Sequence, residues 1–191
     1  MKTKKQNADF LHVGRKLLNW YEINGRDLPF RKTSDPYKIW ICEIIFQQTR
    51  IEQGLNHYRN FIERFPDVQT LANAETDEVL LYWKGLGYYS RALNLHKAAL
   101  QIVNDLNGVF PSEHQDILEL KGVGKYTAAA ISSICFGKKI VAVDGNFYRV
   151  LSRVFADDFD TSTGAPIAIC GRSRTLIAAG TACAAANLTI C

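Results

Sequence analysis

Apolar residues recur every three or four positions along most of the chain up to about residue 156, which is the spacing of one face of an α-helix. The clearest such stripe runs from Ile51 to Phe65, where Pro66 stops it. Asp35 and Pro36 form a typical helix start, because Asp caps the first N–H groups and Pro fits the first turn. The pattern predicts helices over residues 9–21, 51–65, 90–105, 116–120, 125–136 and 146–155. It also predicts one helix that begins at residues 35–36 and another that ends at residue 85. Residues 140–143 are the only strand candidate and are short, so the predicted fold class is all-α.

The composition is that of an ordinary globular protein, with 47% hydrophobic and 22% charged residues among 191. A formal charge of +4 permits an anionic partner without demanding one. The N-terminus, MKTKKQNADF, is basic but no apolar run follows it, so we do not expect a signal peptide. No stretch approaches the ~20 apolar residues of a membrane span. We therefore expect no contact with membranes. Five cysteines without a CxxC pair favour a reducing compartment, so we also expect a cytoplasmic protein.

One carboxylate stands in an apolar run, in the stretch WICEIIFQQT at residues 40–49. Burying an ionised Glu is costly unless it is paired or stays protonated, so Glu43 requires an explanation. The residues that follow, Gln47, Gln48 and Thr49, fit either a functional segment or simply the polar end of a helix.

A glycine-containing turn joins two predicted helices in the stretch LKGVGKYTA at residues 120–128. Glycines let a turn adopt backbone angles closed to other residues and let a phosphate come close, and the N–H groups at the start of the second helix then face that anion. Such a helix-hairpin-helix clamps the DNA backbone without reading its sequence. The alternative is an ordinary helix connection with structural glycines, and the turn alone leaves both interpretations open.

Asp144 lies directly before a predicted helix in the stretch VAVDGN, where an Asp is most often an N-cap. A second interpretation pairs it with Glu43. Two acids that flank an N-glycosidic bond can divide the work of breaking it: one, with its pKa raised by apolar surroundings, protonates the leaving group, and the other stays ionised and stabilises the sugar cation. Glu43 has the apolar setting for the first role, and Asp144 at a helix N-terminus suits the second.

The chain closely resembles MutY-type adenine DNA glycosylases of the helix-hairpin-helix glycosylase superfamily. The resemblance runs from residue 21 to about residue 155 through the stretches YEINGRDLPFR, DPYKIWICEIIFQQTRI, FPDVQTLANAETDEVLLYWKGLGYYSRALNLHKAA, LKGVGKYTAAAISSICFGK and VDGNFYRVLSR. It implies the helix-hairpin-helix DNA glycosylase fold, with a six-helix core at 29–138 and the hairpin at about 116–136. Residues 1–28 and 139–160 would then belong to a second, incomplete helical domain.

The resemblance also implies an activity, the removal of adenine mispaired with 8-oxoguanine or guanine. The adenine is flipped out of the duplex and its glycosidic bond is hydrolysed. By similarity, Glu43 would protonate adenine at N7, and Asp144 would stabilise the cation or attack the sugar. Tyr126 and Asn146 would position the groups near Asp144. The expected partner is double-stranded DNA carrying such mispairs, bound by a monomer in the bacterial cytoplasm and nucleoid.

The resemblance assigns DNA contacts to several further residues. Arg31 resembles the residue that holds the flipped adenine, although next to residues 28–30 it could equally be a surface salt-bridge partner. Gln48 and Tyr88 resemble side chains that enter the base stack, although Tyr88 could instead be a core aromatic. The remaining expected DNA contacts are Thr49, Leu86, Gly122, Val123, Gly124 and Lys125.

Position 126 separates two branches of the superfamily. The related endonuclease III enzymes carry a lysine there, which forms a Schiff base and cuts the strand. Here the position holds Tyr126, and the nearest lysine is Lys125. One residue along a helix turns the side chain by ~100°, so Lys125 should not take the place of that lysine. We therefore expect a monofunctional glycosylase. A glycosylase and lyase of the endonuclease III kind, or a binding module that clamps DNA without catalysis, are the alternatives.

The resemblance implies two inorganic groups. Family members carry a 4Fe-4S cluster on four closely spaced cysteines, but Cys170, Cys183 and Cys191 are separated by thirteen and eight positions and do not reproduce that ligand set. A monovalent or calcium ion at the hairpin backbone, near Leu118 and Val123, is also expected.

The character of the sequence changes after about residue 160. From Thr161 onward the chain has only two charged residues, Arg172 and Arg174, and eight alanines. No amphipathic stripe emerges from this segment, and the resemblance fades at the same point. Our hypothesis is that truncation or a change of reading frame replaced the ordinary C-terminus with an atypical tail at 161–191.

Overall fold

The computed structural model describes residues 2–146, 149 and 153, and every regular element within them is helical. The elements are α1 (Lys2–Asn24), η1 (Pro29–Arg31), α2 (Pro36–Ile45), α3 (Ile51–Arg64), α4 (Val68–Ala72), α5 (Thr76–Trp83), α6 (Ser90–Asp105), α7 (His114–Leu118) and α8 (Lys125–Phe136). The all-α prediction is confirmed. The strand candidate at 140–143 is wrong: it lies in a loop, and a lone extended segment has no partner with which to form a ladder.

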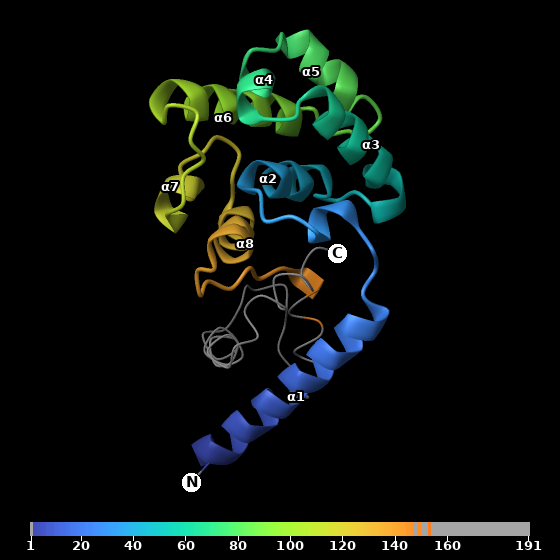
Figure 1. The fold of residues 1–191 in the computed structure, drawn as a ribbon, viewed down its shortest axis with the longest axis vertical. Coiled ribbons are helices and arrows are strands. Elements are labelled where there is room, and N and C mark those ends of the chain that lie inside the picture. The colour runs from blue at the N-terminus through green and yellow to red at the C-terminus, as the bar shows by residue number, and fades with distance from the viewer. Residues whose placement is uncertain (1, 147–148, 150–152, 154–191) are drawn as a thin grey trace.

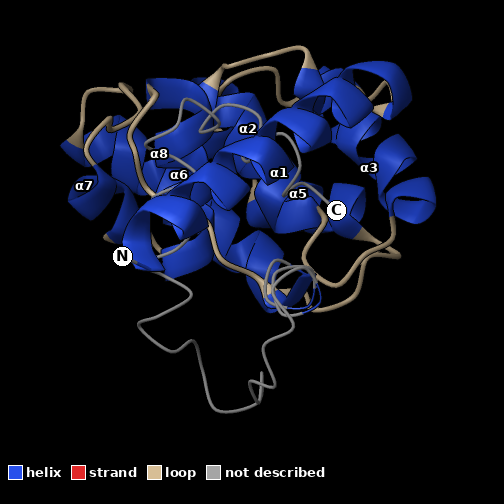
Figure 2. Cartoon of the chain, turned by 90° about the horizontal axis from the view of Figure 1, so that it is seen from below, coloured by secondary structure: helices blue, strands red, loops and turns tan. Residues whose placement is uncertain are grey.

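Helix α2 lies at the centre of the structure, in contact with η1, α3, α6 and α8. Figure 1 shows α3, α4, α5 and α6 on one side of it and α7 and α8 on the other. Helix α1 extends away from this body and is joined to it through the segment that carries η1. The view along the perpendicular direction contains no strand within the described residues (Figure 2). The core of residues 29–138 is therefore built around one short helix.

Helix α2 is buried on every side. A helix that is apolar all round belongs in the interior of a protein, and this one has few polar positions to give to solvent. The buried residues of α2 are Tyr37, Ile39, Trp40, Ile41, Cys42, Glu43, Ile44 and Ile45. The placement of Glu43 in the core is thus a consequence of the helix that carries it.

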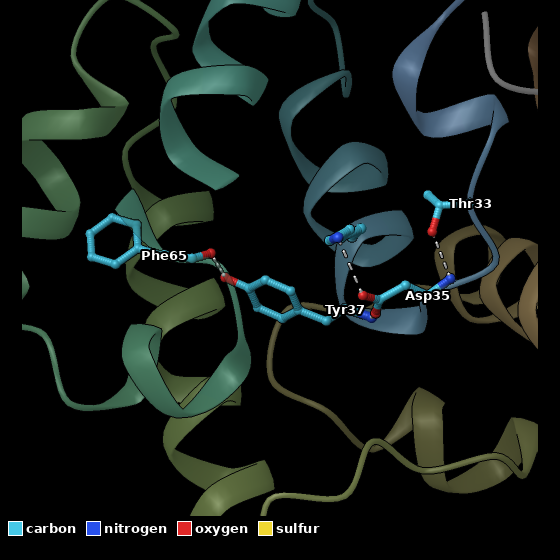
Figure 3. Close-up of polar contacts among 5 residues, drawn as sticks. Thr33, Asp35, Tyr37 and Phe65 are labelled. Atoms are coloured by element: carbon cyan, nitrogen blue, oxygen red, sulfur yellow. Dashed lines mark hydrogen bonds and ion pairs between the residues drawn. The ribbon is translucent and has the colours of Figure 1, made fainter. Parts of the chain in front are cut away.

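The start of α2 is held by three polar contacts (Figure 3). The carboxylate of Asp35 accepts a hydrogen bond from the Tyr37 backbone N–H at 3.0 Å, so the predicted N-cap is confirmed. The Asp35 N–H donates to the Thr33 hydroxyl at 3.1 Å. The Tyr37 hydroxyl donates to the Phe65 carbonyl at 2.7 Å, which ties α2 to the end of α3, and burial raises the pKa of this phenol. These contacts fix the axial position of α2 and hence of Glu43.

The other end of α2 is held by an aromatic cluster. The Phe30 ring lies 5.0 Å from the Phe46 ring and 5.6 Å from the Tyr58 ring. Gly54 on α3 faces Phe46 so closely that a Cβ there would lie 2.6 Å from a ring carbon, so glycine is required for this approach. The turn after α2 is thereby pressed against the first turn of α3.

Most predicted helices are found with small shifts. Helices α6 and α8 have the predicted bounds, and α7 with α8 forms the predicted helical pair of the hairpin. The predicted helix ending at 85 is α5, which ends at Trp83, and the short helix α4 before it was not predicted, so residues 29–138 hold seven α-helices. Helix α2 ends at Ile45, which places residues 47–49 in a turn and not on a polar helix end. Most of the predicted helix at 146–155, and all of the tail at 161–191, lie outside the described residues.

Within the described residues, no helix combines the length and the apolar character that crossing a bilayer requires.

Candidate active site

A cavity of about 690 Å³ opens where α2 ends and α8 begins. The turn at 46–49, the start of α3, the first turn of α8 and the segment at 144–146 all contribute to its wall. Several residues singled out from the sequence line it together: Glu43, Gln48, Thr49, Tyr126, Asp144 and Asn146. Residues about a hundred positions apart in the chain thus line the same cavity.

Glu43 lines this cavity and is only 5% exposed. Burial raises the pKa of its carboxyl to about 8, and the charge of Asp144 contributes a smaller part of the rise. Its Oε1 atom has no hydrogen-bond partner among the described residues. A carboxyl with this pKa is neutral at pH 7, so Glu43 carries a proton that it can donate into the cavity.

Asp144 follows α8 in the loop that returns to the cavity, and it is half-buried. Its Oδ2 atom accepts a hydrogen bond from the Asn146 amide at 3.2 Å. The Asn146 oxygen in turn accepts one from Arg149 at 2.7 Å, which sets the orientation of the amide so that its NH₂ group faces Asp144. The chain from Arg149 through Asn146 therefore orients a carboxylate toward the cavity that Glu43 also faces.

Lys125 and Tyr126 are the first two residues of α8, and their side chains have different surroundings. Tyr126 is half-buried, lines the cavity and packs against the small apolar cluster of Ala129, Ala130 and Ala142. Lys125 is exposed and is not among the residues that line the cavity. The described wall of the cavity therefore presents a phenol at this position and no amine.

The turn after α2 has an unusual backbone. Gln48 is exposed and has φ of +56°, a region that costs a non-glycine residue roughly 1–2 kcal/mol. Thr49 is buried, and its N–H and hydroxyl donate to the carbonyls of Phe46 and Gln47, both at 3.3 Å. Gln47 also reaches α8, where its amide donates to the Thr127 hydroxyl at 3.5 Å. Gln47 lines the cavity, and the sequence had left it open between a functional segment and the polar end of a helix.

A second loop, at 84–89, presents Tyr88 to solvent. Tyr88 is 67% exposed, so its interpretation as a core aromatic is wrong. Its φ is +45°, and it follows Gly85 at +98° and Gly87 at +69°. Leu86 is buried beneath the loop, and the Trp83 indole donates to the Gly87 carbonyl at 3.1 Å. Leu86 and Tyr88 are not among the residues that line the cavity.

The hairpin between α7 and α8 requires glycine at one position. Gly122 has φ of +76°, and a Cβ there would lie 2.6 Å from the Asn94 Cβ. The Val123 N–H donates to the Leu120 carbonyl at 3.0 Å and closes the turn, and Gly124 is the N-cap residue of α8. The backbone near Leu118, which is half-buried, and Val123 stays a predicted cation site.

Arg31 lies in η1 and contacts Arg26. Its Nη1 donates to the Arg26 carbonyl at 3.3 Å, and its guanidinium stands 5.2 Å from the centre of the Tyr21 ring. Arg26 lines the cavity, whereas Arg31 is not among the lining residues. No sequence pattern singled out Arg26.

The cysteines of the described residues do not fit an iron–sulfur cluster. Cys42 is buried in α2, and Cys135 on α8 is half-buried with the pKa of its thiol raised to about 12 by burial. A cluster ligand must be a thiolate, and no group of three or more Cys, His, Asp or Glu side chains gathers among the described residues. Cys170, Cys183 and Cys191 lie outside them. The described part of the chain therefore supports no chemistry through a cluster.

The fold, an all-helical body with a glycine hairpin between α7 and α8, is that of the helix-hairpin-helix DNA glycosylases. Residues 41–165 match the HhH-GPD superfamily of base excision DNA repair proteins, and the chain belongs to this family.

Three known proteins illustrate the similarity. The adenine DNA glycosylase of Buchnera aphidicola subsp. Baizongia pistaciae is 43% identical over 141 residues, which are 73% of this chain and 40% of that protein. The human adenine DNA glycosylase is 40% identical over 156 residues, 77% of this chain and 29% of that protein. The solved structure of a thermostable thymine-DNA glycosylase has a TM-score of 0.84 and 31% identity, covering 100% of this chain and 86% of that one. The chain thus spans well under half the length of the two adenine DNA glycosylases.

Proposed function

We propose that this chain is an adenine DNA glycosylase, which removes adenine mispaired with 8-oxoguanine or guanine from double-stranded DNA by hydrolysis. The observation that carries the proposal is the neutral, buried acid Glu43, which lines the same cavity as the carboxylate of Asp144. The identity of 40–43% with adenine DNA glycosylases supports the choice of base. We place the protein in the cytoplasm at the nucleoid, acting as a monomer.

In the proposed reaction, Glu43 gives its proton to N7 of a flipped adenine, which makes the base a better leaving group. The bond between sugar C1′ and N9 then breaks, and its electron pair leaves with the adenine. The Asp144 carboxylate stabilises the sugar cation, and a water molecule adds to C1′ and gives its extra proton to the Glu43 carboxylate, which restores the acid. The products are neutral adenine and an abasic site. Because position 126 holds Tyr126, no amine attacks C1′ and the strand stays intact.

The other site residues are assigned to holding the DNA. Tyr126 and Asn146 position the groups around Asp144, and Arg31 holds the flipped adenine. Gln48 and Tyr88 enter the space that the base vacates, which accords with the exposure of both side chains. The remaining DNA contacts are Thr49, Leu86, Gly122, Val123, Gly124 and Lys125, with a monovalent or calcium ion held by the backbone near Leu118 and Val123. We assign α1 and the described residues from 139 onward to part of a second helical domain; residue 1, residues 147–148, residues 150–152 and residues 154–160 of the expected segments lie outside the described residues.

The test is a duplex carrying adenine opposite 8-oxoguanine, incubated with the protein and then treated with hot alkali. Strand cleavage at the adenine that requires alkali supports the proposal. Cleavage before alkali indicates an endonuclease III-like lyase, and binding without cleavage indicates a DNA-binding module. Glu43→Gln and Asp144→Asn are expected to abolish excision while sparing phosphate-driven binding and its salt dependence. If either variant excises at the wild-type rate, the division of roles between the two acids is wrong.

A second candidate is the removal of thymine, which the similarity to a thermostable thymine-DNA glycosylase favours. Thymine has no N7, so the proton of Glu43 would have to reach a carbonyl oxygen of the pyrimidine. A duplex with thymine opposite guanine, run beside the adenine duplex, separates the two candidates. We expect cleavage of the adenine duplex only, and faster excision of thymine would reverse the assignment of substrate.

A further inference from the structure

The guanidinium of Arg91 binds the carbonyl groups at the end of helix α2. Arg91 is the second residue of α6 and is half-buried. Its Nη1 atom donates to the carbonyls of Ile44 at 2.8 Å, Ile45 at 3.3 Å and Gln47 at 2.7 Å. The last carbonyls of a helix have no partner within the helix, so Arg91 supplies donors where α2 leaves acceptors. The residue that follows these carbonyls is Gln48.

The same guanidinium binds the second loop. Its Nη2 atom donates to the carbonyls of Leu86 at 3.2 Å and Gly87 at 3.3 Å. Its central carbon lies 5.4 Å from the centre of the Trp83 ring and 5.7 Å from that of Tyr88. One cation thus joins two segments that are about forty positions apart, the turn at 46–49 and the loop at 84–89.

Each of these segments carries a non-glycine residue with positive φ. Gln48 has φ of +56° directly after a carbonyl that Arg91 holds, and Tyr88 has φ of +45° directly after another. Such backbone conformations persist only where the surroundings enforce them. Both side chains are exposed, so neither is held by burial of its own. The guanidinium of Arg91 is the group common to both turns.

We propose that Arg91 is a positioning residue, which holds Gln48 and Tyr88 in one fixed arrangement by bonding the carbonyl before each of them. Its relevance to base removal rests on the proposed function, in which these two side chains fill the space that a flipped base leaves. Without Arg91, five carbonyl bonds are lost, and the two residues relax toward ordinary negative φ. Both side chains then point elsewhere while α2 and its neighbours stay packed.

Arginine and lysine differ at this position in a way that tests the proposal. The arginine fork presents separate nitrogens to the two segments, whereas a lysine presents its three donors from a single nitrogen. Arg91→Lys therefore keeps the charge and can satisfy one segment but not both. Arg91→Met removes all of the donors but keeps an unbranched apolar chain in the space. Arg64→Lys is the matched control, because Arg64 on α3 is also half-buried, pairs with Glu78 and lies over the Phe65 ring.

The first measurement is hydrogen exchange of peptides that cover residues 46–49 and 84–91, with no DNA present. We expect Arg91→Lys to speed exchange in one of the two segments, Arg91→Met to speed it in both, and Arg64→Lys to change neither. Wild-type exchange in both segments of Arg91→Met would overturn the proposal. This readout does not depend on any enzymatic activity.

The second measurement is single-turnover excision of adenine, together with affinity for an undamaged duplex and for one with a tetrahydrofuran abasic analogue. For folded Arg91→Lys we expect excision about 10- to 100-fold slower and weaker preference for the abasic analogue, with affinity for the undamaged duplex unchanged. A lower melting temperature with the wild-type excision rate and preference would show a merely structural role and overturn the proposal. If the wild-type protein excises no adenine, the proposed function fails, whereas hydrogen exchange and the preference for the abasic analogue still decide the role of Arg91.

Discussion

Replacement of Glu43 by glutamine should make the protein more stable at neutral pH while it removes the proposed proton donor. The ordinary pKa of this carboxyl is 4.5 and burial raises it to about 8 in the folded state. The folded protein therefore holds the proton more tightly than the unfolded chain. The stability that this proton contributes is fully present below pH 4.5, is lost as the pH rises toward 8, and changes no further above that. Glutamine has the same shape and does not titrate, so its contribution is constant.

The size of the effect follows from the pKa difference, because one unit corresponds to about 1.4 kcal/mol. Relative to wild type, Glu43→Gln should gain about 3 kcal/mol in free energy of unfolding between pH 4.5 and pH 7, and about 4 kcal/mol between pH 4.5 and pH 8. This is a large share of the 5–15 kcal/mol of a typical domain.

Urea unfolding followed by circular dichroism from pH 4.5 to pH 8.5 measures the difference directly. Glu63→Gln is the control, since it makes the same substitution at an exposed position on α3. A Glu43→Gln difference that does not change with pH would refute the reasoning, because it would mean that the Glu43 carboxyl is ionised and solvated in the folded protein. The same variant should also lose adenine excision, so higher stability and lower activity are expected together.

Three further predictions concern the residues around this site. Asp144→Asn removes the second cause of the raised pKa of Glu43, so the pKa should fall but stay above 4.5, as measured by NMR titration of the Glu43 carboxyl carbon; an unchanged pKa would show that Asp144 does not act on Glu43. Tyr37→Phe leaves the Phe65 carbonyl without its buried donor and should cost about 1–2 kcal/mol in urea unfolding, with no change in the pH dependence described above. Gly122→Ala forces a side chain into a backbone with φ of +76° and should destabilise the hairpin by about 1–2 kcal/mol. It should also weaken binding to undamaged DNA in a low-salt titration, and wild-type affinity would remove Gly122 from the DNA contacts.

Local signals were sufficient for the helices and for part of the site. The Asp35–Pro36 start of α2 and the bounds of α6 and α8 are found as the sequence predicts, because caps, glycines and apolar spacing act within a few residues of each helix end. The apolar neighbours of Glu43 likewise indicated burial, since they belong to the same helix. The burial of the carboxyl was therefore readable before the structure was known.

Long-range contacts account for what could not be predicted. Glutamine and tyrosine rarely adopt positive φ, and the group that enforces it at Gln48 and Tyr88 is Arg91, which is distant from the first of them in the chain. The segment at 140–143 has the composition of a strand but lies in a loop, because strand pairing depends on a neighbour that composition does not report. Both cases depend on which segments meet in space.

The two acids of the cavity are placed by independent parts of the structure. Glu43 is held by the packing of α2 and becomes neutral chiefly through burial, whereas Asp144 arrives on the loop after α8 and is oriented by Asn146. Under the proposed function, displacement of that loop would leave a neutral Glu43 and an intact hairpin but remove the carboxylate that is proposed to stabilise the sugar cation. Such a protein would still clamp DNA through its backbone contacts and would no longer break the glycosidic bond. DNA binding without catalysis is therefore the result that we expect if residues 139–146 leave their positions. The same fold would then account for both the proposed enzyme and the alternative of a DNA-binding module.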